Sequence, residues 1–162
     1  MAASANAAGV AKHYARGGAL LQRLKEALLG AGLDVAKVSS ADLDPVDEFH
    51  LGGRATAEKL FDLLAPEEGA SVLDVGSGLG GPARLLAERK IHVVGIDLTP
   101  AYVEAANAMT SWPGVGLADR CEFKVGDALC VGGCGGGRGE WFALRAFVAN
   151  LCGRDVTDPH LI

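Results

Sequence analysis

The segment VLDVGSGLGG at residues 72–81 has the residue types and the spacing best suited to hold a ligand. Gly76, Gly78 and Gly81 form the pattern G-x-G-x-x-G between an apolar run and a helix-forming run. Glycines at such a turn let the backbone bend sharply, and they let a ligand approach without a Cβ in the way. We therefore interpret this segment as a ligand-binding turn rather than as a tight turn alone.

Three carboxylates follow three successive apolar runs. Asp74 stands two residues before Gly76, Asp97 ends the second run, and Asp127 follows the third. Because parallel strands end at the same edge of a sheet, we expect these acids to share one ligand-binding edge.

The acid in front of the glycines favours one ligand over another. A nicotinamide dinucleotide carries a pyrophosphate, which Asp74 would repel, although the glycines match the dinucleotide fingerprint. S-adenosylmethionine instead carries an α-ammonium for Asp74 and a carboxylate that the N–H groups of the glycine turn could bind. Asp97 would accept from its ribose hydroxyls and Asp127 from its adenine amine. We expect S-adenosylmethionine as the cofactor, with an NAD-dependent oxidoreductase as the alternative.

Short apolar strands alternate with helices around these residues, at the spacing of βαβ units. The predicted elements are strands at residues 71–75, 91–96 and 121–125 and helices at residues 82–89 and 100–109. Phe123 and Val125 are expected to face inward, and the Thr99 hydroxyl is expected to cap the second helix. Parallel strands joined by helices predict an α/β fold.

Two amphipathic helices are predicted ahead of the sheet. Leucines at positions 20, 24 and 28 form one stripe on a helix within residues 10–29. Phe61 lies with two leucines on one side of a second helix, at residues 56–64, and residues 33–48 form a connector with one helical turn.

The motifs DVGSGLG at 74–80, GID at 95–97 and GDA at 126–128 together resemble those of class I S-adenosylmethionine-dependent methyltransferases. His13 and Tyr14, and FHLGG at 49–53, resemble the lid and the Gly-Gly loop of the small-molecule branch. That branch includes the sarcosine, dimethylglycine and phosphoethanolamine N-methyltransferases. The resemblance implies a Rossmann-like fold and methyl transfer to an amine or a similar metabolite.

The resemblance also implies which residues contact the cofactor. Leu98 would pack on the adenine, Gly52 and Gly53 would approach the methionyl end, and Tyr14 would close over the site. The full implied set is Tyr14, Gly52, Gly53, Asp74, Gly76, Ser77, Gly78, Gly80, Asp97, Leu98, Asp127 and Ala128. No general base is assigned, because in this branch the acceptor residues lie largely after a fourth strand.

Composition limits the partners. The 162 residues carry a formal charge of 15 − 20 = −5, which argues against binding nucleic acid or an anionic membrane surface. No apolar run is long enough to span a bilayer, and the cysteines show no metal-binding spacing. We expect a small-molecule acceptor, no metal and a cytoplasmic location. An alanine-rich N-terminus with four basic residues before its first acid makes an organelle the alternative.

The C-terminal part departs from the methyltransferase pattern. We divide the chain into a helical lid with the Gly-Gly loop at residues 1–66, a cofactor-binding half-domain at 67–129 and a glycine-rich tail at 130–162. The run CVGGCGGGRG at 130–139 is typical of a flexible linker. We expect a chain truncated after its third strand, with the edge of its first strand open. A non-catalytic S-adenosylmethionine-binding fragment is therefore a second alternative.

Overall fold

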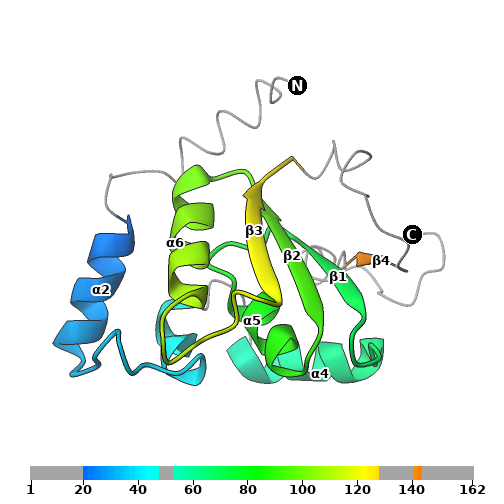
Figure 1. Ribbon diagram of the computed structural model, residues 1–162, viewed down its shortest axis with the longest axis horizontal. Helices are drawn as coiled ribbons and strands as arrows, with labels where there is room; N and C mark the ends of the chain where they lie inside the picture. The colour runs from blue at the N-terminus through cyan, green and yellow to red at the C-terminus, as the bar shows by residue number, and fades with distance from the viewer. Residues whose placement is uncertain (1–19, 48–52, 128–140, 144–162) are drawn as a thin grey trace.

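A parallel sheet forms the centre of the molecule (Figure 1). The computed structural model describes residues 20–47, 53–127 and 141–143. Its strands are β1 (Ser71–Val75), β2 (His92–Asp97), β3 (Cys121–Val125) and β4 (Trp141–Ala143). Their spatial order is β3-β2-β1-β4, and every neighbouring pair is parallel. This is the order of the first four strands of a Rossmann sheet.

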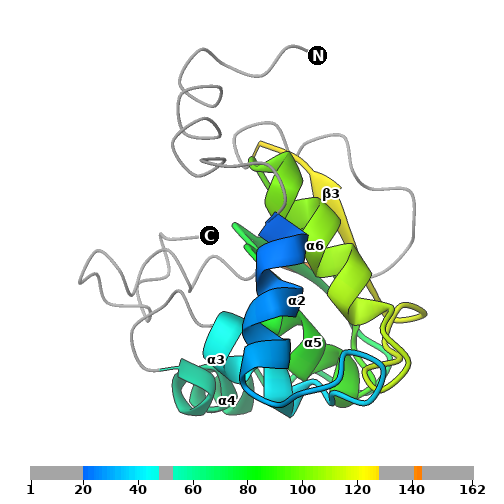
Figure 2. The same ribbon diagram turned by 90° about the vertical axis from the view of Figure 1, so that its left-hand side faces the viewer.

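The helices lie around the first three strands. They are α2 (Leu20–Gly30), the short 3-10 helix η1 (Ala41–Leu43), α3 (Asp44–Asp47), α4 (Gly53–Leu64), α5 (Gly81–Glu88) and α6 (Pro100–Thr110). Helix α5 packs against β2, and α6 packs against β2 and β3. Figure 2 shows α2 lying alongside α6, with α3 and α4 near the start of α5. None of the described helices is long and apolar enough to cross a membrane.

Two apolar clusters hold these layers together. The first joins the sheet to α4 and α5 and includes Phe61, Leu86 and Phe123. The second joins α2 and the connector to α6 and includes Leu28 and Leu79. Leu79 lies in the loop at residues 76–80, so the helices that precede the sheet help to anchor this loop.

Helix α6 also covers the edge of the sheet at β3. The Asn107 side chain donates to the carbonyl of Phe123 at 2.9 Å, and the Phe123 N–H donates back to Asn107 Oδ1 at 2.9 Å. An edge strand otherwise exposes such groups for pairing with other chains. A single side chain therefore satisfies two backbone groups at this edge.

Most predicted elements are confirmed to within three residues. The prediction of an open edge at β1 is wrong, because Trp141–Ala143 pairs with Ser71–Leu73 as β4. The apolar run at residues 141–151 is compatible with a helix or a strand, and pairing with the edge of β1 makes Trp141–Ala143 a strand.

Two smaller predictions are also wrong. Val125 shares a face of β3 with Phe123 but is 57% exposed, because it pairs with Asp97 at the end of the sheet, where the chain leaves the core. Thr99 does not cap α6 with its hydroxyl. Its side chain is buried, and its N–H instead donates to Asp97 Oδ1 at 2.8 Å.

Candidate functional site

The carboxyl end of β1 is the switch point of the sheet, because β2 and β3 lie on one side of β1 and β4 lies on the other. Ligands of open α/β sheets bind in the crevice outside such a point. The glycine loop, residues 76–80, leaves β1 at this place and leads into α5. The topology therefore puts the glycine loop at the position expected for a ligand.

The glycine loop combines an open face with a packed one. Gly76 and Gly78 have φ of 76° and 55°, and a Cβ built on either would meet nothing within 4 Å. Gly80 has φ of 85°, and a Cβ there would come within 2.7 Å of Phe123 Cε1. The first two glycines leave room for a ligand to approach, whereas Gly80 lets the loop lie directly on the sheet.

The N–H groups of the glycine loop are largely used within the protein. Gly76 and Ser77 both donate to the carbonyl of Ile96, at 2.8 and 3.0 Å. Gly78 donates to Asp97 Oδ2 at 3.0 Å, and Gly80 donates to the carbonyl of Ser77 at 2.8 Å. The expectation that these N–H groups bind a ligand carboxylate is therefore not met. They hold the loop against β2 instead.

Asp74 is buried beneath this edge of the sheet. Asp74 pairs with Gly95 of β2 in the sheet, and it is only 3% exposed. Its Oδ2 atom is buried and has no hydrogen-bond partner in the described part of the chain. Burial, with a smaller contribution from the charge of Asp97, raises the pKa of Asp74 to about 7. A cation reaching this carboxyl group would stabilise its charged form.

Ser77 presents a second unpartnered polar atom. Its Oγ is buried and makes no hydrogen bond within the described residues. A Cβ on Gly95 would come within 2.8 Å of this oxygen, so the Ser77 side chain lies over the sheet. Unsatisfied buried polar atoms are rare in folded proteins, and two of them at the junction of β1 and the glycine loop favour a polar ligand there.

Asp97 connects the glycine loop to the start of α6. One carboxylate oxygen accepts from the Gly78 N–H at 3.0 Å and the other from the Thr99 N–H at 2.8 Å. Each oxygen keeps a second lone pair, so Asp97 can still accept hydroxyl groups from a ligand. Its role in holding the loop was not part of the sequence prediction.

The third acid lies at the same edge. The Gly126 N–H donates to the Asp97 carbonyl at 3.0 Å, which brings Asp127 next to the end of β2. Asp127 and Leu98 are both half-buried. The structure thus brings Asp74, the glycine loop, Asp97 and Asp127 together.

The upstream candidates are only partly described. Gly53 begins α4 with φ of 56°, and Arg54 after it forms ion pairs with Asp44 at 3.3 Å and Glu88 at 3.2 Å. Tyr14, Gly52 and Ala128 lie outside the described residues.

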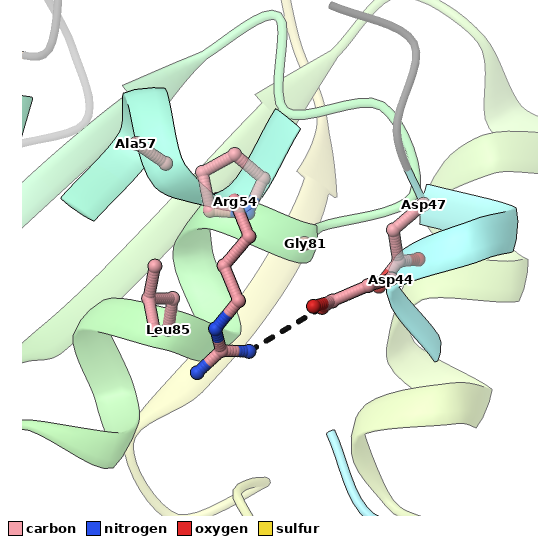
Figure 3. Close-up of a pocket in the computed structure, with 7 residues that line it drawn as sticks. Asp44, Asp47, Arg54, Ala57, Gly81 and Leu85 are labelled. Carbon is pink, nitrogen blue, oxygen red and sulfur yellow. Dashed lines mark hydrogen bonds and ion pairs between the residues drawn. The ribbon is translucent and has the colours of Figure 1, made fainter. Parts of the chain in front are cut away.

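A pocket beside the start of α5 is shown in Figure 3. It is lined by Asp44, Asp47, Arg54, Ala57, Gly81, Pro82 and Leu85. Its charged side chains form ion pairs: Arg54 with Asp44, and Asp47 with the buried Arg84. Sequence reasoning found neither pair, because the partners lie 10 and 37 residues apart without any motif.

The described residues contain no metal-binding group of acidic, histidine or cysteine side chains. Burial raises the pKa of the Cys121 thiol to about 12, which keeps this cysteine protonated.

The comparison with protein families agrees with the geometry. Residues 72–132 match the family model of the methyltransferase domain. The match begins within β1, covers the glycine loop and all three acids, and extends past β3. The resemblance to methyltransferases is thereby confirmed.

Individual methyltransferases are similar to part of this chain. A probable chloroplastic tocopherol O-methyltransferase of Oryza sativa subsp. japonica is 42% identical over 66 residues, which are 40% of this chain and 18% of that protein. A phosphoethanolamine N-methyltransferase of Triticum aestivum is 40% identical over 77 residues, which are 47% of this chain and 14% of that protein. The chain therefore spans less than a fifth of the length of these two relatives.

Solved structures give a comparable match. An S-adenosylmethionine-dependent methyltransferase from Geobacter sulfurreducens, crystallised with S-adenosyl-L-homocysteine, is 32% identical. The match covers 46% of this chain and 30% of that one, with a TM-score of 0.41.

Proposed function

We propose that this chain binds S-adenosylmethionine at the carboxyl end of β1 and supplies the cofactor half of a methyltransferase for a small-molecule acceptor. The observation that supports it best is Oδ2 of Asp74, which is buried and has no hydrogen-bond partner among the described residues, two residues before the open glycine loop. A carboxyl group in that position suits a ligand with a cationic end, and it opposes a pyrophosphate. A nicotinamide dinucleotide is accordingly the weaker candidate.

Each residue at the edge has a distinct part in this proposal. Asp74 would pair with the α-ammonium, and the open face at Gly76 and Gly78 would receive the methionyl chain. Asp97 would accept from the two ribose hydroxyls. Asp127 would accept from the adenine amine, and Leu98 would pack on the adenine ring.

The chemistry demands little of catalytic side chains. When bound, the cofactor supplies a methyl group on a sulfonium. Methyl transfer from a sulfonium is a displacement reaction, and correct positioning of the reactants contributes much of its rate. The chain's own task is therefore to hold and orient the cofactor. Tyr14 and Gly52 stay predicted cofactor contacts, and no residue is assigned as a base.

The acceptor class is suggested by the relatives, whose names include tocopherol, phosphoethanolamine and a methylenesterol. An amine or a similar metabolite is the proposed acceptor. The cytoplasmic location and the absence of a nucleic-acid partner stay predictions from composition.

Calorimetric titration of the full chain with S-adenosylhomocysteine and with NAD tests the cofactor. Binding of the first and not the second is expected, and the reverse would overturn the proposal. Transfer of labelled methyl groups to a panel of small amines then separates an active enzyme from a binding fragment.

A pair of glycine variants locates the site. Gly76→Ala places a methyl group on the open face of the glycine loop, whereas Gly32→Ala places one in open space in the turn after α2. Their φ values are 76° and 80°, so the backbone strain is matched. We expect Gly76→Ala to weaken binding by about tenfold or more, a cost of about 1.4 kcal/mol. Equal affinities for the two variants would place the ligand elsewhere.

A further inference from the structure

One guanidinium group, that of Arg84, joins three separate parts of the molecule. Arg84 lies in α5 and is completely buried. Its Nη1 donates to the carbonyl of Leu79 in the glycine loop at 2.8 Å and to Thr110 Oγ1 in α6 at 3.3 Å. Its Nη2 donates to Asp47 Oδ2 in α3. The glycine loop is thereby tied to a helix that precedes the sheet by more than twenty residues.

The arginine packs directly beneath the glycine loop. A Cβ built on Gly80 would lie 3.2 Å from Arg84 Nη1. The Leu79 side chain is buried in the apolar cluster with Leu24 and Leu28 of α2, while its carbonyl accepts from Arg84. The loop is held from below by Arg84 and from the β2 side by Asp97.

Stability alone is a poor explanation for this buried ion pair. Taking both charges out of water is costly, and apolar residues of similar volume often give equal or greater stability. Arg84 Nε also has no hydrogen-bond partner among the described residues, which adds to the cost. The arrangement makes better sense if the contact to the loop carbonyl has a use beyond folding.

We propose that Arg84 is a positioning residue for the cofactor site, with Asp47 orienting its guanidinium. The contact to the Leu79 carbonyl sets the path of residues 78–80 and therefore the open face at Gly76 and Gly78. Arg84 acts through the glycine loop and does not itself touch the ligand. The inference rests on the proposed function, because it assumes that the glycine loop receives S-adenosylmethionine.

The test compares the full wild-type chain with the double variant Asp47→Leu plus Arg84→Met. Replacing both partners removes the charges together, so the free energy of unfolding in urea is expected to stay close to that of the wild type. The Leu79 carbonyl loses its donor, and affinity for S-adenosylhomocysteine is expected to fall by about tenfold, which corresponds to about 1.4 kcal/mol. Arg89→Met is the matched control, since Arg89 follows α5 and forms an exposed pair with Asp62. It is expected to leave the affinity unchanged.

A second measurement does not depend on the ligand. Hydrogen exchange at the Gly78 and Gly80 amides reports whether the loop opens. Exchange about tenfold faster in the double variant than in Arg89→Met, at equal global stability, supports the proposal. If these amides exchange as in the wild type, Arg84 is not a positioning residue. If the wild-type chain binds no S-adenosylhomocysteine, the proposed function fails while the exchange result still decides the role of Arg84.

Arg84→Lys covers the case in which the double variant does not fold. A lysine keeps the charge facing Asp47, but its single ammonium cannot reproduce the fork of donors that reaches both Asp47 and Leu79. Weaker binding and faster loop exchange at near-normal stability are expected. Normal binding and normal exchange in this variant would overturn the proposal.

Discussion

The ends of β1 and β2 lie side by side at the same edge of the sheet, yet their carboxylates have opposite environments. Asp97 on β2 accepts hydrogen bonds from the backbone N–H groups of Gly78 and Thr99. Asp74 on β1 is buried, its Oδ2 has no partner in the part of the chain that the structure describes, and its pKa is raised. A satisfied carboxylate supports the fold, whereas an unsatisfied one lowers stability and calls for an explanation, which the proposed function supplies as a ligand. Asp97 therefore helps to build the loop, whereas Asp74 is the carboxyl group that we propose to bind a cation.

The largest effect is expected for Gly80→Ala, in the glycine loop, which leaves β1 and lies against the end of β2. The new Cβ would lie within 2.7 Å of Phe123 Cε1 and would force a non-glycine residue to φ of 85°. Strain and overpacking together should lower the free energy of unfolding by about 2–4 kcal/mol in urea titrations. Gly116→Ala has φ of 60° without such a clash and should cost only about 1 kcal/mol. Equal losses in the two variants would show that the loop does not press on Phe123.

Asp97→Asn tests the satisfied carboxylate. An amide has only one acceptor oxygen, so its NH₂ group must face either the Gly78 or the Thr99 N–H. We expect a loss of about 1–3 kcal/mol in unfolding free energy and at least about tenfold weaker binding of S-adenosylhomocysteine. Asp62→Asn, at an exposed ion pair, is the control and should change neither quantity much. Unchanged stability would mean that Asp97 does not hold the loop.

Asp74→Asn tests the unsatisfied carboxylate through its pH dependence. The folded-state pKa of about 7 lies above the ordinary value of 3.8, so the folded protein binds more protons than the unfolded chain between these two values. The free energy of unfolding of the wild type should therefore fall as the pH rises from about 4 to about 7. The variant should lack this part of the fall, and urea titrations across this range measure the difference.

Asp74→Asn should also bind S-adenosylhomocysteine more weakly than the wild type does. This should hold even at a pH at which the variant is the more stable protein. A cation at Asp74 favours the deprotonated carboxylate, so binding to the wild type should strengthen as the pH rises through about 7. This rise should be absent in Asp74→Asn. Parallel pH profiles of affinity in both proteins would contradict the assignment of Asp74 to the ammonium.

The smallest effect is expected for Asp127→Ala, at the end of β3. The proposed hydrogen bond to the adenine amine would be lost, which should weaken S-adenosylhomocysteine binding by about 0.5–1.5 kcal/mol. The effect should be smaller than that of Asp97→Asn, because Asp97 holds the loop and is also proposed to accept from the ligand. A larger loss of affinity in Asp127→Ala than in Asp97→Asn would show that the end of β3 contributes more to binding than the end of β2.

Local sequence was sufficient for the elements and for the common edge at which the glycine loop and the three acids lie. The apolar run before Gly76 and the alternation of strands with helices follow from short-range patterns, and strands β1 and β3 have the predicted bounds. The glycines and the three acids each stand at a strand end, so their common edge follows once the strands are parallel. The family resemblance rests on these same short motifs.

Contacts between distant residues could not be predicted in this way. The pair of Asp47 and Arg84 joins α3 to α5, and β4 pairs with β1 across a separation of about seventy residues. The alternation along β3 predicts that Val125 faces inward, yet Val125 is exposed because it lies at the end of the strand, beyond the core. An alternating pattern shows which face of a strand a residue lies on, but it does not show how far along the strand the core extends.

The sequence by itself determined the α/β fold, the glycine loop and the acids at the strand ends, because turns and strand alternation depend on neighbouring residues. The tertiary structure alone decided which carboxylate is satisfied, which N–H groups of the loop are already used and which arginine lies beneath it. Those outcomes depend on burial and on partners brought from other elements, and a polar group acquires its energy only from that environment.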